Sequence, residues 1–111
     1  MTEKLSKEYL ELLSRQFKIL SDPLRLAVIQ ELKESEKCVS DLVEILNANQ
    51  GNISKHLGYL SEAKMVKRRK EGLRVYYSLA SPIIVEICNI VCSKIEEDIK
   101  SQMSLLDESQ Y

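Results

Sequence analysis

The segment "NQGNISKHLGYL", residues 49–60, constrains the fold more than any other stretch of the chain. Its apolar residues Ile53, Leu57 and Leu60 recur at i, i+4 and i+7, the spacing of a helix that packs on a core through one narrow stripe. The other positions are mostly amides, hydroxyls and basic groups. Such side chains suit hydrogen bonds to base edges and phosphates, but they suit water equally well. The neighbouring segments must therefore decide whether this side of the helix binds nucleic acid or faces only water.

These neighbours predict a helix-turn-helix. Residues 3–20 and 23–34 read as two helices, the second following "SDP", which supplies an N-cap and a proline for the first turn. Residues 39–64 read as the helix-turn-helix itself, with Ser40 as the expected N-cap of its first helix. That first helix carries four apolar residues expected to face inward: Leu42, Val43, Ile45 and Leu46.

The sequence after the helix-turn-helix predicts a wing. Residues 65–80, "MVKRRKEGLRVYYSLA", read as two strands joined by a turn at "EG". A last helix, 83–106, has an apolar stripe too long for one small core to cover. The predicted fold class is therefore mainly α with a β-hairpin wing, a winged helix-turn-helix of about five helices and two strands in a single domain, residues 1–111.

The distribution of charge favours a nucleic-acid partner. The net charge is −1, but residues 55–74 hold seven cations and two anions, a local balance of +5 that leaves −6 on the remainder. A basic block on an acidic body attracts phosphate locally, although a solvated charge run has the same composition. Because this block follows a helix with a polar face, the order of elements predicts a reader of double-stranded DNA.

Composition also excludes several classes of protein. His56 is the only histidine, and no glycine-rich phosphate loop or nucleophile elbow is present, so we predict a binding protein and not an enzyme. No apolar run approaches the ~20 residues of a membrane-spanning helix. The N-terminal sequence lacks the features of a secretory signal, which predicts a cytoplasmic protein with reduced cysteines.

Three consecutive segments carry a family resemblance. "FKILSDPLRLAVIQEL", "CVSDLVEIL" and "NQGNISKHLGYLSEAKMVKRRKEGLRVYYSL" resemble the signatures of the ArsR/SmtB family of bacterial winged-helix repressors, over about residues 15–80. The resemblance implies a homodimer built from the helices at 3–20 and 83–106, which binds operator DNA and releases it when an inducer arrives. The predicted DNA contacts are Asn49, Gln50, Asn52, Ser54, Lys55 and His56 on the recognition helix and Arg69, Lys70 and Arg74 on the wing. For His56, the sequence favours a phosphate contact and a helix-packing role about equally.

The inducer is harder to predict. Arsenic-sensing members of the family have "C-V-C-D-L" where this chain has "CVSDL", with Cys38 kept and Ser40 in the second place. The zinc site of the family on the last helix needs carboxylate and histidine pairs, whereas this helix offers Ser81, Ile83, Lys94 and Glu97 near those positions. Neither metal site is complete here, and no cofactor is required.

The cysteines are the candidate sensors. Cys38 at a helix start has the most reactive position, because the helix dipole favours a thiolate there. Cys88 and Cys92 share one face of the last helix, where Cys88 also suits packing in the dimer core. We predict sensing through these thiols, by oxidation, by reactive sulfur, or by joint binding of a thiophilic ion such as arsenite to all three. The alternatives are a winged-helix module that binds protein and a regulator without thiol sensing.

Overall fold

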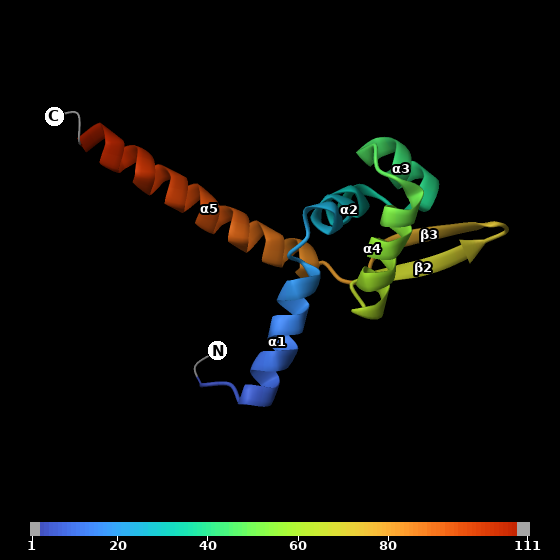
Figure 1. Cartoon of the computed structure of the whole chain (residues 1–111), viewed down its shortest axis with the longest axis horizontal. Helices are drawn as coiled ribbons and strands as arrows, with labels where there is room; N and C mark the ends of the chain where they lie inside the picture. Colours follow the sequence, from blue (N-terminus) through green and yellow to red (C-terminus); the bar gives the residue numbers. More distant parts are fainter. Residues whose placement is uncertain (1–2, 109–111) are drawn as a thin grey trace. The chain divides into compact units, whose positions relative to one another are not determined.

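The computed structural model describes residues 3–108, which separate by their internal contacts into one unit that ends at Ser81 and a second that begins at Pro82. The second unit holds one helix, α5 (Ile83–Glu108). The first unit holds all the other elements (Figure 1): α1 (Lys7–Ile19), α2 (Pro23–Glu34), β1 (Lys37–Cys38), α3 (Val39–Leu46), α4 (Gln50–Glu62), β2 (Val66–Glu71) and β3 (Arg74–Leu79). These are the predicted helices and wing, with one additional strand.

Side-chain caps determine where the first two helices begin. Asp22 Oδ1 accepts hydrogen bonds from the backbone N–H groups of Leu24 (2.9 Å) and Arg25 (3.1 Å), and Pro23 occupies the first turn of α2 as expected. The first helix was predicted from residue 3, but it begins at Lys7. Ser6 Oγ accepts from the Tyr9 N–H at 3.1 Å, and this cap places the start of α1 later than the apolar pattern indicated.

The start of α3 corrects a second prediction. Ser40 was expected as the N-cap, but Cys38 is the cap and Ser40 lies inside the first turn. The Cys38 N–H donates to Asp41 Oδ2 at 3.0 Å, which satisfies the backbone at the helix start. Cys38 is also a strand residue that pairs with Tyr76. Because this pairing holds Cys38 extended, the helix begins at the next residue.

The sheet has three strands in the order β1-β3-β2, all antiparallel. The predicted two-stranded wing is β2 and β3, and β1 was missed because it is only two residues long. Glu71 pairs with Arg74, so the loop is Gly72–Leu73 and not the predicted Glu71–Gly72. Gly72 has φ +62°, which suits the first position of a two-residue hairpin loop, where glycine carries no steric penalty.

The core of the first unit lies where α2, α3 and α4 meet and pack against β2 and β3. All three residues of the predicted α4 stripe, Ile53, Leu57 and Leu60, are fully buried, as is Leu42 of α3. Ile45 was expected to face inward with Leu42, but it is 49% exposed, so the buried side of α3 is narrower than predicted. The stripe of α4 thus faces inward, and Gln50, Asn52, Ser54 and Lys55 of the same helix are exposed.

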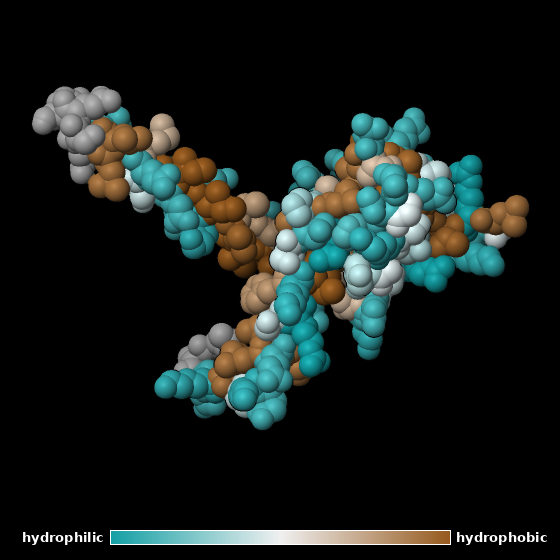
Figure 2. All heavy atoms as spheres, in the orientation of Figure 1, coloured by the Kyte–Doolittle hydropathy of each residue, from teal (hydrophilic) through white to brown (hydrophobic). Residues whose placement is uncertain are grey.

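Two helices carry large apolar side chains in exposed positions. Figure 2 shows brown residues along α5. The exposed ones are Ile83, Ile90, Val91, Ile95, Ile99, Met103, Leu105 and Leu106. Helix α1 exposes Tyr9, Leu10, Leu12 and Phe17 in the same way. Within residues 3–108, no helix has the length and apolar composition needed to cross a membrane.

Replacing Leu57 with alanine is expected to lower the free energy of unfolding by about 2–5 kcal/mol, because truncating a fully buried leucine leaves a cavity. Urea unfolding followed by circular dichroism measures this change. Gly58→Ala is the matched control, since a Cβ at this exposed helical position meets no atom within 4 Å. It should leave stability unchanged or raise it by up to about 1 kcal/mol. Equal losses in the two variants would contradict the assignment of Leu57 to the core.

Candidate nucleic-acid interface

The outward side of α4 presents a row of polar side chains. Gln50, Asn52, Ser54 and Lys55 are all exposed. Among the described residues, none of these four side chains has a hydrogen-bond or ion-pair partner. Asn49 is the N-cap, and its Oδ1 accepts from the Asn52 N–H at 2.8 Å. Asn49 therefore fixes where the helix begins, while the next four polar residues remain available to a partner.

Helix α3 supports α4 from behind. The turn between them is short because Asn47 adopts the left-handed conformation (φ 48°, ψ 47°), which asparagine tolerates better than most residues. The Ala48 N–H then returns to the Val43 carbonyl at 3.2 Å. The two helices pack against each other. This is the arrangement of a helix-turn-helix, with α4 as the outer, recognition helix.

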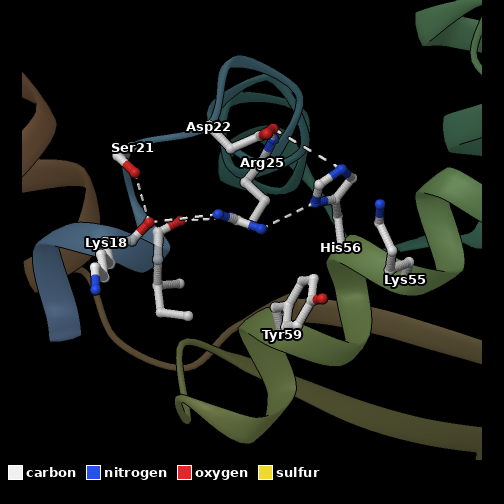
Figure 3. Close-up of a pocket in the computed structure, with 8 residues that line it drawn as sticks. Lys18, Ser21, Asp22, Arg25, Lys55, His56 and Tyr59 are labelled. Carbon is white, nitrogen blue, oxygen red and sulfur yellow. Dashed lines mark hydrogen bonds and ion pairs between the residues drawn. The ribbon is translucent and has the colours of Figure 1, made fainter.

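His56 faces the interior and not the exposed row. It is only 8% exposed, and its Nδ1 lies 3.1 Å from Arg25 Nη1. A guanidinium can only donate, so Nδ1 accepts and the proton of the neutral ring is on Nε2. That nitrogen lies 3.9 Å from Asp22 Oδ1. Figure 3 shows the imidazole facing both groups, with a dashed line to each, so His56 links the recognition helix to the start of α2.

Arg25 is the centre of this link. Its Nε donates to the Ile19 carbonyl at 2.7 Å and its Nη2 to the Lys18 carbonyl at 3.3 Å. The guanidinium carbon lies 5.2 Å from the centroid of the Tyr59 ring. Arg25 therefore joins the end of α1, the start of α2 and the face of α4. The backbone N–H of Arg25 is also the main cause that lowers the pKa of Asp22, and the backbone N–H of Leu24 and the positive charge of Arg25 add to it.

An open hollow of about 450 Å³ adjoins the link and is bordered by Lys18, Lys55 and Tyr59 among others (Figure 3). Sequence reasoning missed Arg25 and Tyr59 as part of this region, because "SDPLRL" was interpreted only as a turn and helix start. The available signal was the position of His56, three residues after Ile53 and beside Leu57, because an imidazole next to a buried stripe requires a partner if it is buried too.

The wing carries most of the basic block. Arg69 lies on β2, and its Nη2 and Nε donate to Glu36 Oε1 (2.6 Å) and Oε2 (3.2 Å). Its Nη1 donates to Glu71 Oε2 at 2.8 Å. These bonds raise the pKa of Arg69, first through Glu36 and then through Glu71. The same bond with Arg69 lowers the pKa of Glu36. Arg69 is therefore already paired in the isolated chain.

Three other wing cations differ from Arg69. Lys70 and Arg68 are exposed, and neither makes an ion pair with any residue in the described part of the chain. Arg68 lies 5.8 Å from the centroid of the Tyr77 ring. Arg74 is exposed at the start of β3, and its pKa is raised, first by a side-chain hydrogen bond with Tyr76. These three cations remain accessible at the edge of the recognition unit.

The three cysteines are all free. Cys38 is at a helix start as predicted, but it is only 6% exposed. Its thiol donates to Asp41 Oδ2 at 3.1 Å and lies 3.1 Å from Ser40 Oγ. On α5, Cys88 is half-buried and Cys92 is exposed, and burial raises the pKa of the Cys88 thiol. Across residues 3–108, no group of three or more His, Cys, Asp or Glu residues is arranged to hold a metal ion.

The braced recognition helix and the adjoining basic hairpin define a winged helix-turn-helix DNA-binding protein. Residues 22–68 match the family of bacterial regulatory proteins named arsR. The transcriptional repressor SmtB homolog of Synechocystis sp. is 30% identical over 95 residues, which cover 86% of this chain and 72% of that protein. The chain belongs to the ArsR/SmtB family of bacterial winged-helix transcriptional repressors.

Solved structures agree with this assignment. The crystal structure of Rv0081 from Mycobacterium tuberculosis has a TM-score of 0.81 at 26% identity, and covers 88% of this chain and 99% of that one. The homodimeric winged helix-turn-helix DNA-binding domain Mb0332 from Mycobacterium bovis has a TM-score of 0.73 at 24% identity. The match covers 87% of this chain and 92% of that one, and it shows a similar fold. The family consists of DNA-binding regulators and not enzymes, as predicted from the sequence.

His56→Ala is expected to destabilise the first unit by about 1–3 kcal/mol, because it leaves a donor of Arg25 without its acceptor in a part-buried position. His56→Gln should lose less stability than His56→Ala, because the amide oxygen of glutamine can accept a hydrogen bond from Arg25. Ser54→Ala is the matched control on the same helix and should change stability by less than about 0.5 kcal/mol. Urea unfolding of the three variants at one protein concentration tests this. If His56→Ala is as stable as Ser54→Ala, the link does not support the fold.

Proposed function

We propose that this chain is a homodimeric repressor in which each α4 reads the major groove of an operator and each wing contacts neighbouring phosphates. The observation that carries the proposal is the row of Gln50, Asn52, Ser54 and Lys55, which are exposed on α4 with their side chains unpartnered within residues 3–108. Amide side chains pair bidentately with adenine, and lysine reaches guanine or phosphate. Operator binding of this kind takes place in the cytoplasm.

The exposed apolar residues of α1 and α5 support a dimer. Monomeric proteins rarely leave such a series of large apolar side chains exposed, and patches of this kind mark interaction surfaces. A second copy of the chain is the proposed occupant, because two-fold symmetry would also supply the paired recognition helices that a palindromic operator requires. The two half-sites would lie about one helical turn of DNA apart.

The proposed inducer acts through the cysteines. Cys38 caps the helix that braces α4, whereas Cys88 and Cys92 lie four residues apart on α5, the proposed dimer helix. A disulfide between two of these cysteines, formed as peroxide takes up the two electrons and two protons, would couple the recognition unit to the dimer helix. A polysulfide bridge between the same sulfurs, formed by reaction with an added polysulfide, or a thiophilic ion such as arsenite bound by them would have the same effect. A coupling of only about 1–3 kcal/mol moves an operator from mostly bound to mostly free.

Gln50→Ala and Asn52→Ala are each expected to weaken operator binding by about 1–3 kcal/mol, because each removes a side chain placed to read a base edge. Fluorescence anisotropy with a labelled duplex from the chain's own promoter region measures the affinity. Gln30→Ala, at an exposed position of α2, is the control and should bind as the parent does. Unchanged affinity in both α4 variants would refute the recognition-helix assignment. Absent or salt-insensitive DNA binding by the parent would instead favour a protein-binding module.

Single Cys→Ser variants at the three cysteines test the inducer. Operator binding is followed by electrophoretic mobility with peroxide, polysulfide, arsenite or cadmium added in turn. We expect one of these agents to release the parent from DNA, and we expect Cys38→Ser and Cys92→Ser to lose that response while they retain DNA binding. If all three variants respond as the parent does, the cysteines are packing residues and the inducer binds elsewhere.

A further inference from the structure

The cations of the wing are divided between two faces of the hairpin. Side chains alternate across a strand, so Arg68 and Lys70 share the face of the buried Val66, and Lys67, Arg69 and Glu71 lie on the opposite face. Arg74 also lies on the Arg69 face, because it pairs with Glu71. The register confirms this division, because Arg69 pairs with Tyr76 and stacks over it, with 4.8 Å from its guanidinium carbon to the ring centroid. Both faces therefore carry cations, but only the Arg69 face of the hairpin also carries a carboxylate, Glu71.

Acidic partners occur on only one of these faces. Both carboxylates that contact a wing cation, Glu36 and Glu71, contact Arg69. With Arg69 they form a group whose formal charge is −1. Arg68 and Lys70, in contrast, make no ion pair with any residue between 3 and 108. A phosphate that approached Arg69 would meet two carboxylates, whereas one that approached Lys70 would meet none.

Arg69 also spans the sheet. It starts on β2, crosses Tyr76 of β3, and ends at Glu36, which lies beside β1. The contact with Glu36 is bidentate, and the contact with Glu71 adds a third charge-assisted hydrogen bond. Bidentate arginine–carboxylate pairs are among the more geometrically specific polar contacts. This geometry fastens the outer strand of the wing to the segment that leads into α3.

We propose that Arg69 is a positioning residue which Glu36 and Glu71 withhold from DNA, and that the phosphate contacts of this strand come from its other cations, Arg68 and Lys70 among them. This rests on the proposed function, and it gives Arg69 a role different from the DNA contact predicted from the sequence. Glu36, which lies outside the helix-turn-helix and the wing, then sets how many phosphates the wing neutralises.

The test is the salt dependence of binding to a labelled random-sequence duplex of roughly 30 base pairs, measured by fluorescence anisotropy with the full chain. The slope of log affinity against log salt changes by about one unit for each phosphate that a variant ceases or begins to neutralise. Lys70→Gln and Arg68→Gln should each make the slope shallower by about one unit. Arg69→Gln, the neighbouring variant, should leave the slope unchanged within about 0.3 units, a third of the effect of one phosphate.

Releasing Arg69 should have the opposite effect. In the double variant Glu36→Gln, Glu71→Gln the slope should become steeper by about one unit, and adding Arg69→Gln to that background should restore the parental slope. Hydrogen exchange provides the positioning readout: Arg69→Gln should speed exchange of the β2 and β3 amides, and Lys70→Gln should not.

The outcomes separate the inference from the proposed function. If Arg69→Gln reduces the slope as much as Lys70→Gln does, Arg69 is a DNA contact and the inference is wrong. A double variant with the parental slope would overturn it equally, because the carboxylates would then withhold nothing. If the parent itself binds no duplex with a measurable salt dependence, the proposed function fails and the inference fails with it.

Discussion

The burial of one narrow stripe of α4 is the constraint on which the rest of the first unit depends. Ile53, Leu57 and Leu60 are fully buried where α2, α3 and the hairpin meet. Because the stripe is narrow, the same helix presents most of its polar residues outward. Burial of the stripe therefore supplies stability and also fixes which residues of α4 a partner can reach.

Polar contacts then set the orientation of α4 about its own axis. Packing on a narrow stripe leaves a helix free to rotate slightly about its axis, and a single specific contact on one side removes that freedom. The Arg25–His56 contact does this between the end of α1, the start of α2 and α4. Directional hydrogen bonds to a part-buried arginine are costly to break without replacement, so the contact favours one orientation of α4.

How much could be predicted from the sequence depends on how local each cause is. The stripe of α4 and the Asp22–Pro23 start of α2 were predicted correctly, because helical periodicity and capping act over a few residues. The Cys38 cap was missed because cysteine is not a preferred capping residue and the two-residue strand β1 forms only by pairing with distant Tyr76. The contacts of His56 with Arg25 and of Arg69 with Glu36 join residues 31 and 33 apart. No pattern within a short window could predict the partner of either side chain.

The position of Cys38 has a mechanical consequence. Cys38 is the last residue of β1, where it pairs with the central strand of the sheet. It is also the N-cap of α3, the helix that packs against α4. With its thiol enclosed by Ser40 and Asp41, any added atom at Sγ would need space from the first turn of α3 or from the strand pair. A displacement there could not be absorbed by one element alone. The first helix of the helix-turn-helix and the wing sheet thus meet at one residue, so a change of a few atoms at its sulfur would bear on both elements.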